Sequence, residues 1–333
     1  MKELIKKLTE AFGPAGQESK IVDLIKEELD GYVDEMTVDS IGNLIAHKKG
    51  DGEKIMLSAH MDEIGFMITH IEDEGFLRFT NIGGHTPYRL LGLRVIFDNG
   101  TMGVIDAEGV DSPKDIKLDK LFIDIGAKDK EEAEKMVGIG DSCGFYNPTI
   151  YNNDRIIGNS MDDRIGCAVL IKAAQELKSS PNDIYYVFSV QEEVGLRGAK
   201  TSAYSINPRM GIALDVTPTA DTPESNLTLN VELGKGAAIK VKDRSMITHP
   251  TVKNFMIDTA EKNEIEYQLE VLPYGGTDAG AIHVTREGIP SGTISIPCRY
   301  VHSPSEMVDI SDIQASIDLV KGILAEDINK VLS

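Results

Sequence analysis

Residues 187–198 read VFSVQEEVGLRG, and the interpretation of the rest of the chain starts from them. The apolar run at 184–190 predicts a buried strand that ends at Gln191, and two adjacent carboxylates, Glu192 and Glu193, follow at once. Ligand sites in α/β sheets lie just beyond the carboxyl ends of strands. At such an edge, two neighbouring glutamates can differ in role, one as a metal ligand and the other as a proton shuttle. A solvated acidic turn is the ordinary explanation of such a pair, so the remaining motifs decide between the two.

The segments on either side of this stretch alternate between helical and strand patterns. Strands are predicted at 54–60, 210–216, 265–272 and 291–296, and helices at 164–177, 251–263 and 310–332. Alternation of this kind favours the α/β fold class. Two amphipathic helices, near residues 4–12 and 21–29, precede the first strands.

Residues 66–153 have a different texture. Short β-strand patterns alternate there with glycine turns, and Asp98, Asn99 and Gly100 form a strong hairpin signal. Only residues 131–137 have a helical pattern. We therefore predict that residues 1–66 and 154–333 form one catalytic domain, and that residues 67–153 are a β-rich insertion with a role in assembly or gating.

Composition narrows the possible partners and location. The 333-residue chain has 41% hydrophobic residues and a formal net charge of −20, which argues against nucleic acids and anionic membrane surfaces as partners. The cysteines, Cys143, Cys167 and Cys298, lack metal-site spacing and are expected to be buried, reduced thiols. No stretch approaches the roughly 18 apolar residues of a membrane span. The opening helix does not resemble a signal peptide, and a cytoplasmic location is predicted.

Several metal-ligand residues follow predicted strands. His60 and Asp62 lie two residues apart in SAHMDEIGF, so both side chains would point to one face, where the carboxylate could fix the histidine tautomer. Asp215 ends another strand, and His302 follows the strand predicted at 291–296. For His60 and Asp62 alone, an ordinary strand end is the more common explanation, and Asp215 and His302 alone are also typical of a polar strand end and a loop.

Two further motifs stand next to predicted helices. Asp162 and Asp163 precede the helix at 164–177, either as an N-cap or as a bridge between two metals. Gly276, Thr277 and Asp278 belong to a GGTD turn that could contact substrate or simply begin a helix.

Taken together, these residues supply two histidines, two aspartates and a glutamate from separate loops, with a second glutamate beside one of them. That is the ligand inventory of a two-metal hydrolase. In this hypothesis the two metals activate a water, and Glu192 takes its proton. The other histidines are interpreted as structural or surface residues.

Six segments, in order along the chain, resemble the M42 family of dinuclear metallo-aminopeptidases, the tetrahedral or TET-type group. They are SAHMDEIGF, GNSMDDRIGCAVL, VFSVQEEVGLRGA, ALDVTPTADTP, GGTDAGA and YVHSPSEMVD. The resemblance implies a zinc-peptidase-like α/β fold with a mixed central sheet flanked by helices. It also implies that the insertion is a small PDZ-like β-barrel that forms a dimer, and that dimers assemble into a tetrahedral dodecamer.

The resemblance also implies roles for single residues. His60, Asp162 and Asp215 would hold one metal, and Asp162, Glu193 and His302 the other, so that Asp162 bridges them. Glu192 would be the general base, Asp62 would orient His60, and a cis peptide would join Asp162 to Asp163. One departure is His85, because relatives tend to have a small apolar residue after the two preceding glycines.

The predicted function is therefore removal of N-terminal residues from short peptides that have a free amine. Zinc, cobalt or manganese would serve as the two divalent metal ions in each subunit. Relatives include leucyl and glutamyl aminopeptidases, and some have been labelled endoglucanases. Glycoside hydrolysis is thus one alternative, although histidine ligands are superfluous to it and the chain has no tryptophan to stack on sugars. A non-catalytic scaffold is the other.

Overall fold

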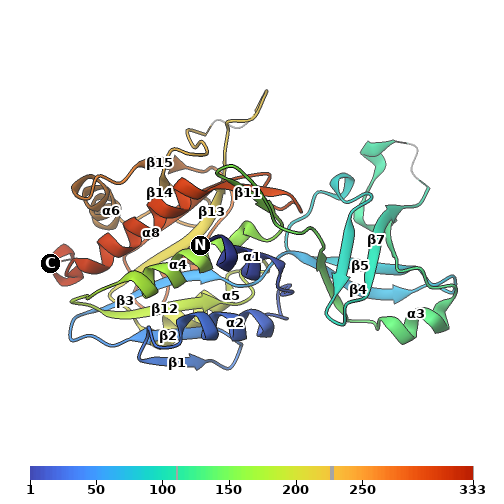
Figure 1. Ribbon diagram of the computed structural model, residues 1–333, viewed down its shortest axis with the longest axis horizontal. Coiled ribbons are helices and arrows are strands. Elements are labelled where there is room, and N and C mark those ends of the chain that lie inside the picture. The colour runs from blue at the N-terminus through green and yellow to red at the C-terminus, as the bar shows by residue number, and fades with distance from the viewer. Residues whose placement is uncertain (110–111, 226–228, 333) are drawn as a thin grey trace.

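The computed structural model describes residues 1–109, 112–225 and 229–332. Figure 1 shows a larger α/β body, in which both chain termini lie, and a smaller β-barrel at one end of it. The chain passes from the larger body into the barrel after β3 (Lys54–His60) and returns before β11 (Arg155–Gly158). The barrel is thus inserted between two segments of the α/β body.

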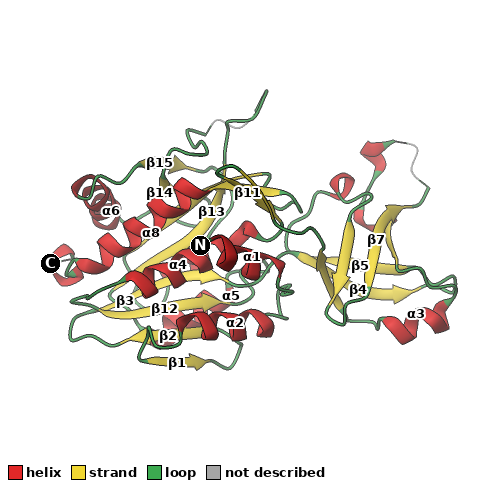
Figure 2. Ribbon diagram, in the orientation of Figure 1, coloured by secondary structure: helices red, strands yellow, loops and turns green. Residues whose placement is uncertain are grey.

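The larger body is built on a mixed sheet, coloured yellow in Figure 2. Its strands lie in the order β1 (Glu35–Val38), β2 (Leu44–Lys48), β12 (Asp183–Ser189), β3, β13 (Met210–Pro218), β16 (Ser291–Arg299), β17 (Glu306–Asp309), β11 and β10 (Ile150–Asn152). Strand β14 (Ala237–Lys242) also pairs with β16, and β15 (Tyr267–Val271) pairs with β14. The central strands β12, β3, β13 and β16 are parallel, so their carboxyl ends meet at one edge.

Helices cover both faces of this sheet. One face packs against α1 (Lys2–Glu10), α2 (Ser19–Leu29), α4 (Met161–Glu176), α6 (Pro250–Lys262) and α8 (Ile310–Ala325), and the other against α5 (Arg197–Ile206) and α7 (Asp278–Ile282). Strand β3 shows why, because its side chains alternate: Ile55 and Leu57 join the first core and Met56 joins the second. A strand buried on both faces has a near-continuous apolar sequence, and residues 54–60 are mostly apolar.

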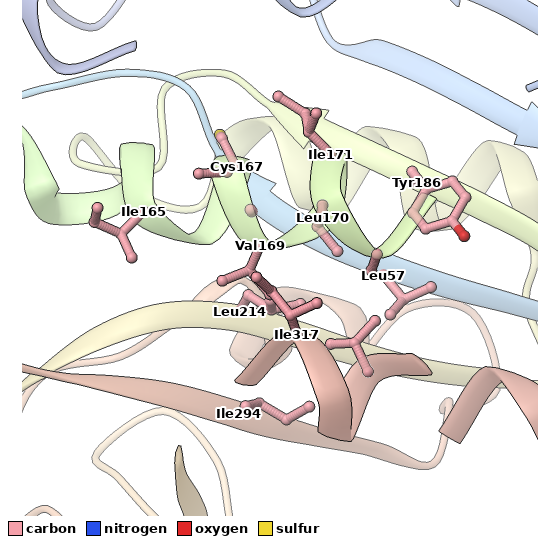
Figure 3. Close-up of a cluster of buried hydrophobic side chains, with 14 of the residues drawn as sticks. Leu57, Ile165, Cys167, Val169, Leu170, Ile171, Tyr186, Leu214, Ile294 and Ile317 are labelled. Atoms are coloured by element: carbon pink, nitrogen blue, oxygen red, sulfur yellow. The ribbon is translucent and has the colours of Figure 1, made fainter. Parts of the chain in front are cut away.

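Helix α4 lies at the centre of the larger core. Its side chains are buried on nearly every side from Met161 to Ala174. Figure 3 shows Val169 and Leu170 close to Leu57 of the sheet and Ile317 of α8. Burying side chains of this size contributes about 1.5–3 kcal/mol each. The packing fixes the start of α4, which is where Asp162 and Asp163 lie.

The barrel has a core of its own. It closes through β4 (Gly65–Ile71), β5 (Leu77–Ile82), β8 (Leu121–Asp124), β7 (Met102–Ala107), β6 (Arg94–Phe97) and β9 (Ser142–Phe145), which pair antiparallel. Helix α3 (Lys130–Met136) and the short 3-10 helices η1 (Pro87–Arg89), η2 (Pro113–Asp115) and η3 (Leu118–Lys120) connect these strands. Phe66 packs edge-to-face on Phe79 and Phe145 inside the barrel.

The predicted fold class is confirmed, and three details differ. Strands β9, β10, β11, β14 and β17 were not predicted, because they are short or contain polar residues. The closing helix, predicted at 310–332, divides into α8 and α9 (Ile328–Val331), and the Asp327 side chain caps the second part. The predicted insertion of residues 67–153 includes β10, whose hydrogen bonds lie in the large sheet. The division into domains itself stays a prediction.

Two composition-based expectations can be compared with the structure. Cys143, Cys167 and Cys298 are buried and unpaired, as expected. Within the described ranges, none of the helices combines the length and the apolar character that crossing a bilayer requires.

Candidate metal centre

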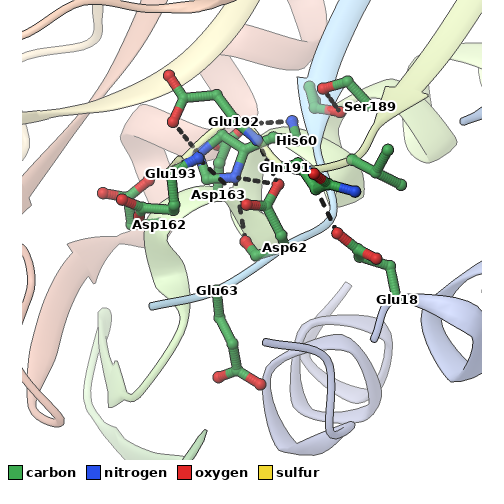
Figure 4. A network of polar contacts seen from close by, with 12 residues as sticks. Glu18, His60, Asp62, Glu63, Asp162, Asp163, Ser189, Gln191, Glu192 and Glu193 are labelled. Atoms are coloured by element: carbon green, nitrogen blue, oxygen red, sulfur yellow. Dashed lines mark hydrogen bonds and ion pairs between the residues drawn. The ribbon is translucent and has the colours of Figure 1, made fainter. Parts of the chain in front are cut away.

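The predicted ligand residues converge at the carboxyl edge of the parallel strands. His60 is the last residue of β3, and Asp215 lies near the end of β13. Glu192 and Glu193 follow β12, and His302 follows β16, whereas Asp162 comes from the first turn of α4. Figure 4 shows His60, Asp162, Glu192 and Glu193 gathered at this edge.

Asp162 lies between two histidines and uses a different oxygen for each. Its Oδ1 is 3.0 Å from His60 Nε2, and its Oδ2 is 3.3 Å from His302 Nε2. Asp215 Oδ1 is 3.9 Å from His60 Nε2, and Glu193 Oε1 is 3.2 Å from His302 Nε2. The side chains therefore form two groups that share Asp162, and in each group the ligand atoms lie within 4.8 Å of one another.

Glu192 lies at the edge of the first group. Its Oε2 is 4.0 Å from His60 Nε2, and His60, Glu192 and Glu193 make a third possible ligand group. Burial raises the pKa of Glu192 well above its ordinary value, and the nearby carboxylates of Asp215 and Glu193 add to that increase. A buried glutamate with a raised pKa can hold a proton that a fully solvated glutamate would release.

The electrostatics of the cluster favour positive charge within it. Burial alone would lower the pKa of His302, but the carboxylates of Glu193 and Asp162 raise it to about 12. Burial and the neighbouring Asp162 raise the pKa of Asp215 well above its ordinary value. These carboxylates are therefore stable together only with protons or cations among them. Imidazole and carboxylate donors at these distances fit divalent cations such as zinc, cobalt or manganese.

Asp62 contacts both His60 and the loop after β12. His60 Nδ1 is 3.0 Å from the backbone oxygen of Asp62 and 3.6 Å from its carboxylate. The carboxylate also accepts the backbone N–H groups of Glu192, at 2.9 Å, and Glu193, at 3.1 Å, as Figure 4 shows. Asp62 thereby ties the loop after β12 to the end of β3.

The start of α4 is held by a second buried network. The peptide bond between Asp162 and Asp163 is cis, as the resemblance implied. The Asp163 carboxylate accepts the backbone N–H of Gly166 at 2.9 Å and that of His60 at 3.3 Å. Glu63 accepts a short hydrogen bond from the Ser160 hydroxyl and another from the Gly13 N–H at 2.9 Å. Asp162 is therefore fixed from both sides along the chain.

Glu306 is a site residue that the sequence analysis missed. Its two carboxylate oxygens accept the backbone N–H of Asp162 at 3.1 Å and that of His302 at 2.8 Å. Burial and the charge of Asp162 raise the pKa of Glu306 to about 8. One side chain thus sets the positions of two candidate ligands. Its place in SPSEM, four residues after His302, was the only available signal.

A cavity of about 920 Å³ opens onto the cluster. The cluster residues that line it are Asp162, Glu192, Glu193, Asp215 and His302. Gly276 also lines this cavity, but Thr277 and Asp278 do not: they are only 1% and 2% exposed. Asp278 accepts hydrogen bonds from Ser58 and Ser189, both at 2.6 Å, and so links β3 to β12. Of the GGTD residues predicted to bind substrate, only Gly276 lies at the cavity wall.

Comparison with known proteins agrees with this geometry. The sequence profile of M42 glutamyl aminopeptidases matches residues 42–319. The chain belongs to the M42 peptidase family. It is 38% identical to the lysyl aminopeptidase of Pyrococcus furiosus, over 97% of this chain and 96% of that protein. It is 44% identical to a solved aminopeptidase from the archaeon Desulfurococcus kamchatkensis, which covers 97% of this chain and 94% of that one with a TM-score of 0.94. This M42 chain is thus a peptide-bond hydrolase of the aminopeptidase kind.

Two other solved structures bear on assembly and on the alternative function. A TET1 peptidase of Pyrococcus horikoshii, described as able to assemble into a tetrahedron or a large octahedral shell, is 34% identical. It has a TM-score of 0.86 and covers 98% of this chain and 99% of its own. A Thermotoga maritima structure described as an endoglucanase is 35% identical, with a TM-score of 0.84 and 99% of both chains covered.

We expect Glu306→Ala to weaken cation binding without unfolding the protein. The change leaves the N–H groups of Asp162 and His302 without their carboxylate acceptor, so both candidate ligands lose a fixed position. Loss of such outer partners typically costs about 10–100-fold in metal affinity. Zinc titration of metal-stripped protein by calorimetry measures the change. Glu306→Gln keeps one oxygen acceptor, so its zinc affinity should fall between those of wild type and Glu306→Ala. Glu74→Ala, at an exposed position, is the control. Unchanged zinc affinity in Glu306→Ala would contradict this role.

Proposed function

We propose that this M42 chain removes N-terminal residues from short peptides with two divalent cations bound in the cluster around Asp162. The observation that supports this most strongly is the division of the Asp162 carboxylate between His60 and His302. His60, Asp162 and Asp215 would hold one cation, and Asp162, Glu193 and His302 the other. A bridging carboxylate with one histidine on each side is typical of two-metal hydrolases.

Cations bound here would supply Lewis-acid chemistry, polarising the scissile carbonyl and lowering the pKa of a water. The residues of the chain would do the rest. The Glu192 carboxylate lies at the cavity wall beside His60, where it can accept a proton from the attacking water. The same carboxyl group can then give that proton to the leaving amine. Asp62 would position Glu192 and Glu193 through their backbone N–H groups.

The exopeptidase character is supported by the relatives named as aminopeptidases. Glu192, the carboxylate of this cavity wall that neither cation would use, would attract the ammonium group of a free peptide N-terminus, and a blocked N-terminus lacks that charge. His and carboxylate donors accept zinc, cobalt and manganese alike, so the cation in the cell depends on availability as well as on the ligands.

We also propose that the barrel mediates self-association, first into dimers and then into a tetrahedral dodecamer. The similarity to the Pyrococcus horikoshii TET1 peptidase supports this. So does the outer surface of β7, where Met102 and Val104 are 41% and 43% exposed. Apolar side chains in neighbouring positions on a strand are typical of interaction surfaces. The cytoplasmic location stays a prediction.

Glycoside hydrolysis has less support. The name of the Thermotoga maritima relative suggests it, but two histidines lie among the carboxylates of this cluster, and a pair of glycosidase carboxylates does not require them. The chain also lacks tryptophan, which commonly stacks on sugar rings. We therefore retain a single proposed function.

Metal-stripped protein should cleave aminoacyl-anilides only after zinc, cobalt or manganese is restored, and only where the amine is free. The physical reason is that hydrolysis requires cations in the cluster, and that substrate binding requires the ammonium group of a free N-terminus. The measurement is anilide release from leucyl, glutamyl and lysyl substrates, each beside its N-acetylated counterpart. Equal cleavage of blocked substrates would contradict the aminopeptidase specificity. Release of reducing sugar from a glucan in the presence of chelator would favour the glycosidase alternative.

The adjacent glutamates offer a matched pair of isosteric variants. Glu192→Gln should bind zinc with the same stoichiometry as wild type, for which we expect two ions per chain, while kcat falls by about 10²–10⁴-fold, because only proton transfer is lost. Glu193→Gln should weaken zinc binding at one site, since it replaces a charged candidate ligand of the group that contains His302. Calorimetric zinc titration and steady-state kinetics on both variants measure the difference. Near-normal turnover in Glu192→Gln, or the same zinc stoichiometry and affinity in both variants, would overturn these assignments.

A further inference from the structure

A turn of the barrel packs against the candidate metal centre. This 83–85 turn follows β5 and consists of Gly83, Gly84 and His85. A Cβ atom placed on Gly84 would lie 3.1 Å from Nδ1 and 3.4 Å from Cε1 of His302. A Cβ atom on Gly83 would lie 3.1 Å from Glu193 Oε2 and 2.5 Å from the Ile64 side chain. The backbone of the turn therefore packs directly against His302 and Glu193, the two candidate ligands that would bind the second cation alone.

His85 fixes the turn to the start of β4 and the end of β5. Its Nε2 lies 2.9 Å from the carbonyl oxygen of Gly65 and 3.0 Å from that of Ile82, so a proton on this nitrogen is shared between two backbone acceptors. Its ring stacks on Phe66 with centroids 4.4 Å apart and an interplanar angle of 26°. Gly65 and Ile82 face each other in the β4–β5 ladder. The turn is therefore an extension of the barrel and not a loose loop.

His302 is the candidate ligand that most needs such support. Its side chain is 36% exposed, whereas His60 is only 2% exposed. Metal-bound histidines usually donate their second ring nitrogen to a hydrogen-bond acceptor. Among the described residues, His302 Nδ1 makes no hydrogen bond, and the surface next to it is the backbone of Gly84. Packing against Gly84 takes the place of that hydrogen bond in limiting rotation of the ring.

We propose that the 83–85 turn is a positioning element for the second cation of its own subunit. It holds the His302 ring and the Glu193 carboxylate in place, and His85 holds the turn. This inference rests on the proposed two-cation site. It gives the inserted barrel a part in cation binding besides self-association. Glycine suits position 84 because a Cβ atom there would lie 3.1 Å from His302 Nδ1, so that the ring would have to move by a few tenths of an ångström.

Gly84→Ala tests the proposal, and Gly138→Ala is its matched control. Neither glycine has a positive φ, so alanine adds only a methyl group, and a Cβ atom on Gly138 meets nothing closer than 3.7 Å. Calorimetric zinc titration of metal-stripped Gly84→Ala should show one site unchanged and the other weakened by about 10–100-fold. Gly138→Ala should bind like wild type, and the thermal midpoint of metal-free Gly84→Ala should stay close to that of wild type.

His85→Phe provides an independent variant, because it keeps the ring stacked on Phe66 and removes the two hydrogen bonds. It should weaken the same site as Gly84→Ala, while His70→Phe, at an exposed position of β4, should not. Normal zinc binding by both Gly84→Ala and His85→Phe would overturn this inference alone. Wild-type protein that binds no divalent cation would overturn the proposed function and the inference with it.

Discussion

The site depends on keeping several mutually repelling carboxylates buried within a few ångströms of one another. Backbone N–H groups hold the outer carboxylates in place: Asp62 accepts two from the loop after β12, Glu306 accepts those of Asp162 and His302, and Asp163 accepts two more. Each of these hydrogen bonds fixes the position of a backbone segment that carries a candidate ligand. Protons or cations must balance the remaining charge, and the raised pKa of His302 reflects the same preference for positive charge beside Glu193 and Asp162.

The fold brings these segments to one place by ordinary means. Parallel strands β12, β3 and β13 end at the same edge, so single residues after each strand meet although they are far apart in sequence. Helix α4 packs on one face of the sheet and is buried on nearly every side, and its first turn places Asp162 at the same edge. On the side of the barrel, Gly84 forms part of the wall of the cavity. The insertion is thus continuous with the centre, although its hydrophobic core is separate.

The side chains of the cluster could be predicted because each stands at a strand end or helix start, next to a strong local pattern. His60 ends an apolar strand, and Asp162 begins an apolar helix. Glu306 and Gly84 could not be found in this way. Glu306 acts through the backbone of Asp162, 144 residues away in the sequence, and Gly84 acts through the absence of a side chain. Neither contact leaves a periodic signal, and the place of Glu306 four residues after His302 does not show which backbone groups it binds. The Asp62 carboxylate lies 3.6 Å from His60 Nδ1, and the two backbone N–H groups that it also accepts from the loop after β12 could not be read from the sequence.

Zinc-edge anomalous diffraction from crystals of the zinc-loaded protein tests the central claim most directly. The account predicts two anomalous peaks, one on each side of the Asp162 carboxylate. The first should lie within bonding distance of His60 and Asp215, and the second within bonding distance of Glu193 and His302. A single peak, or two peaks that do not share Asp162, would contradict it. The positions of the peaks test whether two cations share Asp162, and the choice of substrate does not affect the result, because the positions depend only on which side chains bind the cations.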